Sequence, residues 1–110
     1  MHRFKELIVW QKSRVLVKEI YKQTSTFPET ERFGITSQLR RAVVSISNNI
    51  AEGAGRLSSA EFKRFLNIAY GSSVEVENML ILCNDLKLLT DDSIHLLNQQ
   101  LIEIEKMLYT

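Results

Sequence analysis

The chain has 110 residues, of which 45% are hydrophobic and 25% are charged. This composition is typical of a globular protein, and the length predicts a single domain spanning residues 1–110. No apolar run reaches the ~20 residues that a membrane span needs, and the N-terminus lacks the pattern of a secretory signal. The single cysteine, Cys83, excludes an intramolecular disulfide, so we expect a cytoplasmic protein.

The net charge of +1 hides an uneven distribution along the chain. Residues 1–56 contain ten Lys or Arg against five Asp or Glu, whereas residues 57–110 contain four against eight. The first half is therefore basic and the second half acidic. We expect the basic half to face either an anion or the acidic half of a neighbouring copy.

The first two predicted helices are separated by a break at Pro28 and Gly34. The first runs from about Phe4 to Thr26 and has an apolar face at three- and four-residue steps. The second is expected to end near Gly53 or Gly55, because glycine accepts the left-handed conformation of a helix C-cap. Its apolar face contains Ile35, Leu39, Ala42, Val43, Ile46 and Ile50.

Two further helices begin with clear capping signals. Ser58 and Glu61 form a capping box, with Leu57 and Phe62 spaced as a hydrophobic staple, and Thr90 is the expected cap of the last helix. The predicted core face of the third helix contains Phe62, Phe65, Ala69, Ser72, Val76, Met79, Cys83 and Leu86. That of the fourth contains Ile94, Leu97, Leu101, Ile104 and Leu108. Short connections between long helices predict an all-α fold, an antiparallel up-down-up-down four-helix bundle.

Several apolar residues lie outside these core faces, at Ile8, Val15, Ile68, Ile81 and Leu82. They are either scattered surface residues or a second apolar face that is buried by self-association. In the second interpretation a head-to-tail contact between copies closes into a ring. Gly71 lies on the outer side of the third helix, where its missing side chain permits another helix to approach closely.

The stretch "NNIAEGAGR" at residues 48–56 closes the second helix with polar and flexible residues. In one interpretation Asn48 and Glu52 are solvated and the glycines stop the helix. In the other they belong to a hydrogen-bonded polar layer, with Arg41 pairing with Glu52 or a partner's carboxylate and Asn49 bonding to Ser72 or Ser73. The candidate structural or interface residues are Asn48, Asn49, Glu52, Gly53, Gly71, Ser72 and Glu75.

Two stretches, "SISNNIAEG" and "EFKRFLNIAYGS", together with "FPETERFG", resemble a known family. These motifs are similar to those of four-helix-bundle proteins encoded in intervening sequences of bacterial large-subunit rRNA genes. The resemblance implies a homopentamer with a central hole, related to the accessory protein of diversity-generating retroelements, a basic pentamer associated with nucleic acid and a reverse transcriptase. The family's Asn, Glu and Gly fall on Asn49, Glu52 and Gly53, and its Arg pair falls on Arg40 and Arg41. Ser47 departs from the proline that relatives often carry.

No constellation of residues predicts catalysis. The chain has only two histidines, and the pattern Asp92-x-x-His95 is better explained by a helix start than by a metal site. Cys83 falls on a core face and is expected to be a packed thiol rather than a nucleophile. We therefore predict no enzyme activity, no metal and no cofactor.

The predicted function is that of a non-enzymatic homo-oligomer, a pentamer by resemblance, that binds RNA or DNA through a basic surface without strong sequence specificity. The alternative is an oligomeric scaffold for a protein partner with no nucleic-acid role. The pI of 7.9 is lower than that of a dedicated binder, but a ring repeats a modest patch several times. The candidate nucleic-acid-binding residues are Lys12, Lys18, Lys22, Arg40, Arg41, Arg56, Lys63 and Arg64.

Overall fold

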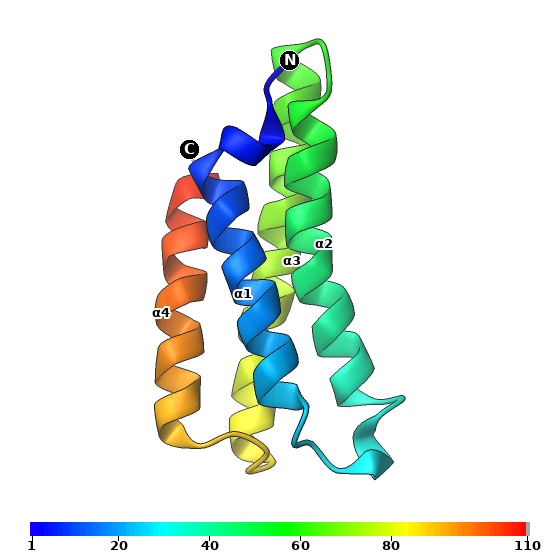
Figure 1. The fold of residues 1–110 in the computed structure, drawn as a ribbon, viewed down its shortest axis with the longest axis vertical. Coiled ribbons are helices and arrows are strands. Elements are labelled where there is room, and N and C mark those ends of the chain that lie inside the picture. Colours follow the sequence, from blue (N-terminus) through cyan, green and yellow to red (C-terminus); the bar gives the residue numbers. More distant parts are fainter. Residues whose placement is uncertain (110) are drawn as a thin grey trace.

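The computed structural model describes residues 1–109, and within that range it contains helices and no strand (Figure 1). The long helices are α1 (Ile8–Thr24), α2 (Ile35–Ala54), α3 (Ser59–Asp85) and α4 (Asp91–Leu108), and the short 3-10 helices are η1 (Phe4–Glu6) and η2 (Glu29–Glu31). The predicted all-α four-helix bundle is confirmed, and successive helices run in opposite directions (Figure 1). Thr110, the last residue of the predicted domain, lies outside the described residues. No described helix is both long and apolar enough to cross a bilayer.

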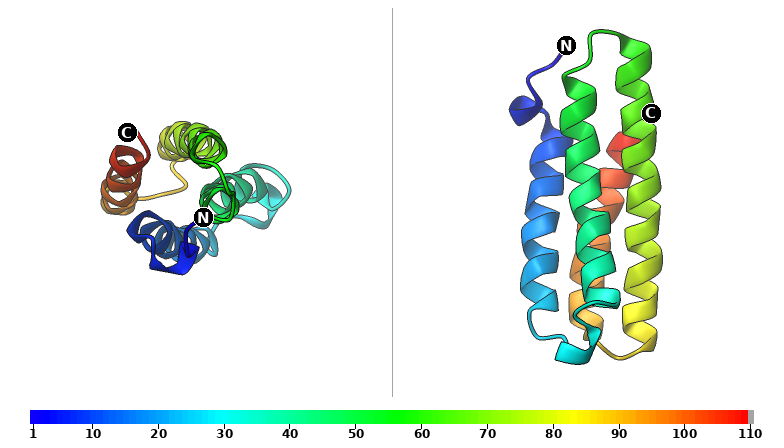
Figure 2. Two further views of the ribbon diagram at one scale, coloured as in Figure 1. Left: turned by 90° about the horizontal axis from the view of Figure 1, so that it is seen from above. Right: turned by 90° about the vertical axis from the view of Figure 1, so that its right-hand side faces the viewer.

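The four helices lie at the corners of an elongated bundle measuring 43 × 25 × 20 Å. Both α1 and α3 pack against α2 and α4, so α1 and α3 occupy diagonally opposite corners (Figure 2). We call the end that contains residues 52–65 the α2–α3 end, and the end that contains residues 21–41 the α1–α2 end. These two ends lie at the top and bottom of Figure 1.

The core follows the predicted apolar faces of all four helices closely. Its fully buried side chains include Leu16, Ile20, Leu39, Val43, Ile46, Ile50, Val76, Cys83, Leu97 and Ile104. Leu86 is an exception, since it is 60% exposed at the C-cap of α3, immediately after the last helical residue Asp85. Ser72 is only half-buried, and Ser73 and Leu80 are fully buried instead. The buried strip of α3 is wider than one heptad stripe because α3 contacts two neighbours.

The start of the chain differs from the prediction that a helix begins near Phe4. Residues 4–6 form η1, Leu7 is extended, and α1 begins at Ile8. The Phe4 ring contacts the Trp10 ring edge-on with centroids 5.0 Å apart, and Gln11 donates a side-chain hydrogen bond of 2.9 Å to the Lys5 carbonyl. The chain therefore folds back so that Phe4 covers Trp10, which a continuous helix would not permit.

The helix ends also differ from the prediction of left-handed glycines. None of the described glycines has a positive φ, and α2 ends through Gly55 with φ −81° and ψ −5°. The left-handed residue is Lys87, which follows α3 with φ 58°. Around it the Leu88 amide donates to the Cys83 carbonyl at 2.9 Å, so a Schellman-type turn closes α3.

The predicted N-caps are confirmed for the last two long helices. The Ser58 hydroxyl accepts from the Glu61 amide at 3.1 Å, and the Thr90 hydroxyl accepts from the Ser93 amide at 3.1 Å. The predicted staple is wrong, because Leu57 is 85% exposed in the connection between α2 and α3. Because Leu57 makes no staple contact, the start of α3 is stabilised by the Ser58 cap without that apolar contact.

Candidate nucleic-acid interface

The predicted polar cluster lies at the α2–α3 end, where two helices approach each other very closely. A Cβ atom at Gly53 would lie 2.6 Å from the Phe65 Cβ and 3.1 Å from Phe62 Cδ1, so no larger residue fits without movement. The glycine of the "NIAEG" stretch therefore permits close packing of α2 on α3. It lies inside the helix and does not stop it.

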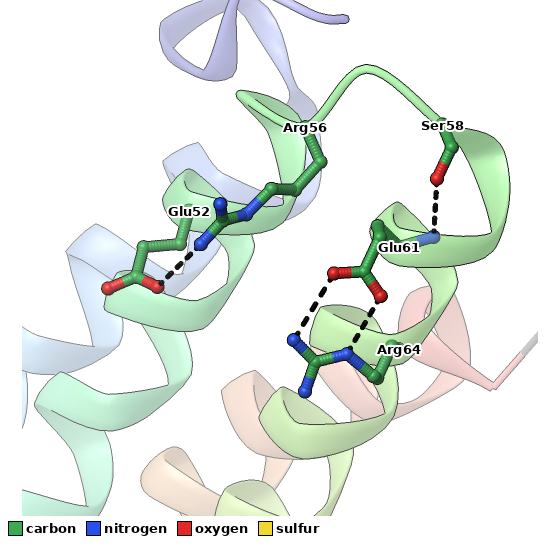
Figure 3. A network of polar contacts seen from close by, with 5 residues as sticks. All are labelled: Glu52, Arg56, Ser58, Glu61 and Arg64. Atoms are coloured by element: carbon green, nitrogen blue, oxygen red, sulfur yellow. Dashed lines mark hydrogen bonds and ion pairs between the residues drawn. The ribbon is translucent and has the colours of Figure 1, made fainter.

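Two arginines at this end have aromatic and acidic partners, and the acidic partners are drawn in Figure 3. The guanidinium carbons of Arg56 and Arg64 lie 4.7 and 4.6 Å from the centroid of the Phe65 ring. Arg64 donates to both carboxylate oxygens of Glu61 at 2.9 and 3.3 Å, and Arg56 lies 3.7 Å from Glu52. The hydrogen bond from Arg64 lowers the pKa of the Glu61 carboxyl. The charges at this end are largely balanced locally, so they offer little to an incoming anion.

The predicted partners of the polar layer need two corrections. Glu52 pairs with Arg56, one turn along the chain, and not with Arg41. The Asn49 amide donates to the Ser45 carbonyl at 2.8 Å and to the Ser45 hydroxyl at 3.1 Å, and that hydroxyl lies 2.8 Å from the Ser72 hydroxyl. The layer between α2 and α3 exists, but Ser45 mediates it. The side chains of Asn48 and Glu75 are exposed and make no hydrogen bond or ion pair within residues 1–109.

The other basic candidates lie on the adjacent helices α1 and α2. Lys18, Lys22 and Arg41 are exposed and have no ion pair among residues 1–109. Arg40 is held in place, since its Nε donates to the Thr24 hydroxyl at 2.9 Å and its guanidinium lies 4.4 Å from the Tyr21 ring. We call the surface formed by Arg14, Lys18, Lys22, Arg40 and Arg41 the α1–α2 face. Of its cations, Lys18, Lys22 and Arg41 remain available to a ligand, whereas Arg40 is held by Thr24 and Tyr21 and Arg14 lies 5.6 Å from the Trp10 ring.

Two of the predicted basic residues, Lys12 and Lys63, do not belong to the α1–α2 face. Two further arginines on or near it were not predicted. Lys12 turns toward α4 and pairs with Glu103 at 2.8 Å, which lowers the pKa of the Glu103 carboxyl. Lys63 lies at the α2–α3 end, away from the α1–α2 face. Arg14, one turn before Lys18, and Arg32, in the connection before α2, were not predicted. The i, i+4 spacing of Arg14, Lys18 and Lys22 was the available signal for Arg14.

The predicted oligomer-interface residues are all exposed, but the bundle does not bring them together. Ile8 and Val15 lie on α1, whereas Ile68, Ile81 and Leu82 lie on α3 at the opposite corner. No heavy atom lies within 4 Å of a Cβ built at Gly71, so the outer side of α3 is open there. One chain therefore presents two separate apolar surfaces, on α1 and on α3.

Two titratable groups have strongly raised pKa values. Burial raises the pKa of the Cys83 thiol to about 11, which keeps it protonated at neutral pH. Burial and then the neighbouring Glu77 carboxylate raise the pKa of Glu105 to about 7, although the Ser73 hydroxyl donates to it at 3.4 Å. Within the part of the chain that the structure describes, no three His, Cys, Asp or Glu side chains gather as metal ligands do.

Comparison with known proteins gives a clear family assignment. A family model described as 23S rRNA-intervening sequence protein matches residues 5–110. A crystal structure from Bacteroides thetaiotaomicron VPI-5482, described as a protein with unknown function from the S23 ribosomal protein family, is 31% identical to this chain. The two structures superpose with a TM-score of 0.82 over 92% of this chain and 94% of that one. No curated protein matches the chain. The chain belongs to the 23S rRNA-intervening sequence protein family, which confirms the resemblance carried by its motifs.

Proposed function

We propose that this protein is a non-enzymatic homo-oligomer, pentameric as the family resemblance implies, that binds RNA or DNA through the α1–α2 face without strong sequence specificity. The observation that carries the proposal is the contrast between the unpaired cations of that face and the paired arginines of the α2–α3 end. Phosphate contacts from Arg and Lys supply most of the affinity in sequence-independent binding.

The geometry of the α1–α2 face favours a phosphate backbone as the ligand. Arg14, Lys18 and Lys22 follow one stripe of α1, and Arg41 extends the positive surface onto the neighbouring α2. Several cations spread along a surface suit an extended polyanion better than a single small anion. A ring of copies repeats this surface, so weak contacts in each copy add to a useful avidity.

The two apolar surfaces support the oligomeric part of the proposal. Ile8 is 58% exposed on α1 and Ile81 is 56% exposed on α3, at diagonal corners of the bundle. A contact between α1 of one copy and α3 of the next would bury both surfaces. Such a head-to-tail contact closes into a ring when its rotation permits.

Binding is tested by titrating a labelled single-stranded RNA at about 50 mM and about 200 mM salt. We expect the triple variant Lys18→Gln, Lys22→Gln, Arg41→Gln to weaken binding and to reduce the slope of log K against log salt by about 2. The matched control removes three charges at the other end, as Arg56→Gln, Lys63→Gln, Arg64→Gln, and is expected to have a small effect. No RNA or DNA retained at the lower salt, or equal effects of the two triples, would overturn the proposal.

The oligomer is tested by light scattering on the purified chain, whose monomer mass is 12.7 kDa. We expect a mass several times larger, and a reduction toward the monomer in the double variant Ile68→Glu, Leu82→Glu. The control Asn67→Glu, Asn84→Glu adds the same charge to exposed polar positions of α3 and should leave assembly intact. A wild-type monomer at micromolar concentration would refute this part.

The second candidate function is an oligomeric scaffold for a protein partner with no nucleic-acid role. It is favoured by the exposed Ile68, Ile81 and Leu82 on α3, if another protein rather than a second copy covers them. A specific protein partner retained after nuclease treatment, together with no RNA or DNA binding at low salt, would favour the scaffold over the nucleic-acid binder.

A further inference from the structure

A cavity of about 370 Å³ lies at the α1–α2 end, between the last turn of α1, the connection after η2 and the first two turns of α2. Its lining combines several arginines with aromatic rings. It includes Arg32, Arg40 and Arg41, the aromatic rings of Tyr21 and Phe33, and Thr36. A cavity of about 350 Å³ at the other end has only one cation, Lys63, in its lining.

The three arginines of this cavity differ in how firmly neighbouring groups hold them. Arg40 is fixed by its bonds to Thr24 and to the Tyr21 carbonyl, the latter at 3.3 Å, and Arg41 has no ion pair within residues 1–109. Arg32 pairs with Glu29 at 3.3 Å, and both side chains are mostly exposed to solvent, so the pair is weak. With Glu31 beside Gly34 as the second nearby carboxylate, the cavity keeps an excess of positive charge.

The start of α2 adds polar groups that lack partners. Within residues 1–109 no side chain hydrogen-bonds the start of this 20-residue helix at Gly34, although a Glu31 carboxylate oxygen would lie 3.4 Å from a Cβ at Gly34. Thr36 and Ser37, in the first turn of the helix, line the cavity, so the positive end of the helix dipole lies near it. Thr36 is only 8% exposed, and its buried hydroxyl has no hydrogen-bond partner among residues 1–109. Thr36 lies in the wall of this cavity and of a neighbouring one of about 190 Å³. A buried hydroxyl without a partner requires an explanation, and an oxyanion bound in the basic cavity would supply an acceptor for it.

Phe33 gives the site a second property. Its ring is 87% exposed, with the Arg32 guanidinium 5.2 Å from the centroid. An exposed ring beside arginines is the usual platform on which proteins stack an unpaired base. A duplex hides the faces of its bases, so such a platform selects single strands.

We propose that this cavity binds one nucleotide of a single-stranded nucleic acid, with its phosphate held by Arg32, Arg41 and the start of α2 and its base stacked on Phe33. The proposal rests on the proposed function and sharpens it, because it names the class of nucleic acid and one specific contact. The stripe of cations on α1 then holds the flanking phosphates without selecting single strands.

The test compares a labelled single-stranded RNA with a duplex of the same sequence, at one salt concentration. We expect Phe33→Ala to weaken single-strand binding about tenfold, because base stacking is lost, and to leave duplex binding unchanged. Leu57→Ala is the matched control, since Leu57 is an equally exposed apolar residue in the connection at the other end, and it should change neither.

A second variant tests the phosphate contact. Thr36→Val keeps the shape of the buried side chain and removes the unpaired hydroxyl, so it is expected to fold normally and to weaken single-strand binding severalfold. Unchanged single-strand binding in either variant overturns this proposal. If single strand and duplex still bind in a salt-dependent way, the proposed function survives that failure, whereas the loss of all nucleic-acid binding by the wild type removes both.

Discussion

The two ends of the bundle use the same residue type in opposite ways. At the α2–α3 end, Arg56 and Arg64 lie over Phe65 and pair with carboxylates, and a glycine brings the helices together. At the α1–α2 end, Arg41 is unpaired within residues 1–109 and Phe33 is almost fully exposed. The difference lies in the exposure of the ring, because Arg32 beside Phe33 also has a carboxylate partner, Glu29, in a pair that is mostly exposed to solvent.

The largest loss of stability is expected from a substitution that disrupts the close packing of α2 and α3 at the α2–α3 end. Gly53→Ala places a Cβ against the Phe65 Cβ, so α2 and α3 must separate, and we expect a loss of about 2–3 kcal/mol in the free energy of unfolding. Urea denaturation measures it. Gly55→Ala is the matched control, because a Cβ there would lie at an ordinary contact distance, 3.5 Å from the Glu52 carbonyl, and it should be nearly neutral. A neutral Gly53→Ala would mean that this contact is not tight.

A smaller loss of stability is expected when the side-chain cap at the start of α3 is removed; the start of α2 has no such cap. Ser58→Ala removes the acceptor of the Glu61 amide and is expected to cost about 1 kcal/mol in thermal or urea unfolding. Ser59→Ala, one residue later and exposed, makes no cap and should be nearly neutral. Equal losses in both variants would show that the cap does not stabilise the helix.

The end of α4, which lies at the α2–α3 end, carries a pH-dependent weakness at Glu105. Its pKa of about 7 in the folded protein exceeds the ordinary value of 4.5, so the folded state binds more protons between those values and stability falls as pH rises through that window. Because the group is partly exposed, we expect Glu105→Gln to gain under about 1 kcal/mol at pH 8 and to flatten the dependence.

The control for this pH effect has the opposite sign. Glu103 pairs with Lys12, and its lowered pKa means that its contribution to stability is present above the ordinary pKa and lost as pH falls. Glu103→Gln should therefore gain nothing at pH 8. Denaturation curves across pH 4 to about pH 8 distinguish the two variants, and parallel behaviour would contradict the assignment.

The smallest expected effect concerns the other end of α3. Lys87 has a left-handed conformation that costs a residue with a Cβ more than it costs glycine, so Lys87→Gly is expected to gain about 0.5 kcal/mol. Lys87→Ala keeps the Cβ and serves as the control for the lost charge. A loss of stability in Lys87→Gly would show that the backbone strain there is negligible.

The element pattern was predictable because it depends on local rules. The spacing of apolar residues located all four helices, and the caps at Ser58 and Thr90 were placed correctly. The errors fell where packing decided the outcome. Leu86 fits the heptad but lies beyond the helix end, and Phe4 leaves its expected helix to cover Trp10.

The candidate site was less predictable, since the sequence lists cations but not their partners. Lys12 resembles Lys18 in the sequence, yet the folded chain pairs it with the distant Glu103. The pairs of Arg56 with Glu52 and of Arg64 with Glu61 follow i, i+4 and i, i+3 spacings that the sequence already contains. Arg32 and Phe33 lie in a connection with no helical periodicity to mark them. Their place in a cavity depends on how the connection lies against α1 and α2.

The fold class, the family and the uneven distribution of charge follow from the sequence alone, because periodicity, motifs and charge count are properties of the chain order. The three-dimensional structure was needed to see how closely α2 and α3 approach at Gly53 and that the Thr36 hydroxyl is buried with no partner among residues 1–109. The pairing of Lys12 with Glu103, the steric fit at Gly53 and the burial of Thr36 depend on distances between residues remote in sequence, which the chain order does not specify. The pairs of Arg56 and Arg64 are local, since each joins residues three or four positions apart.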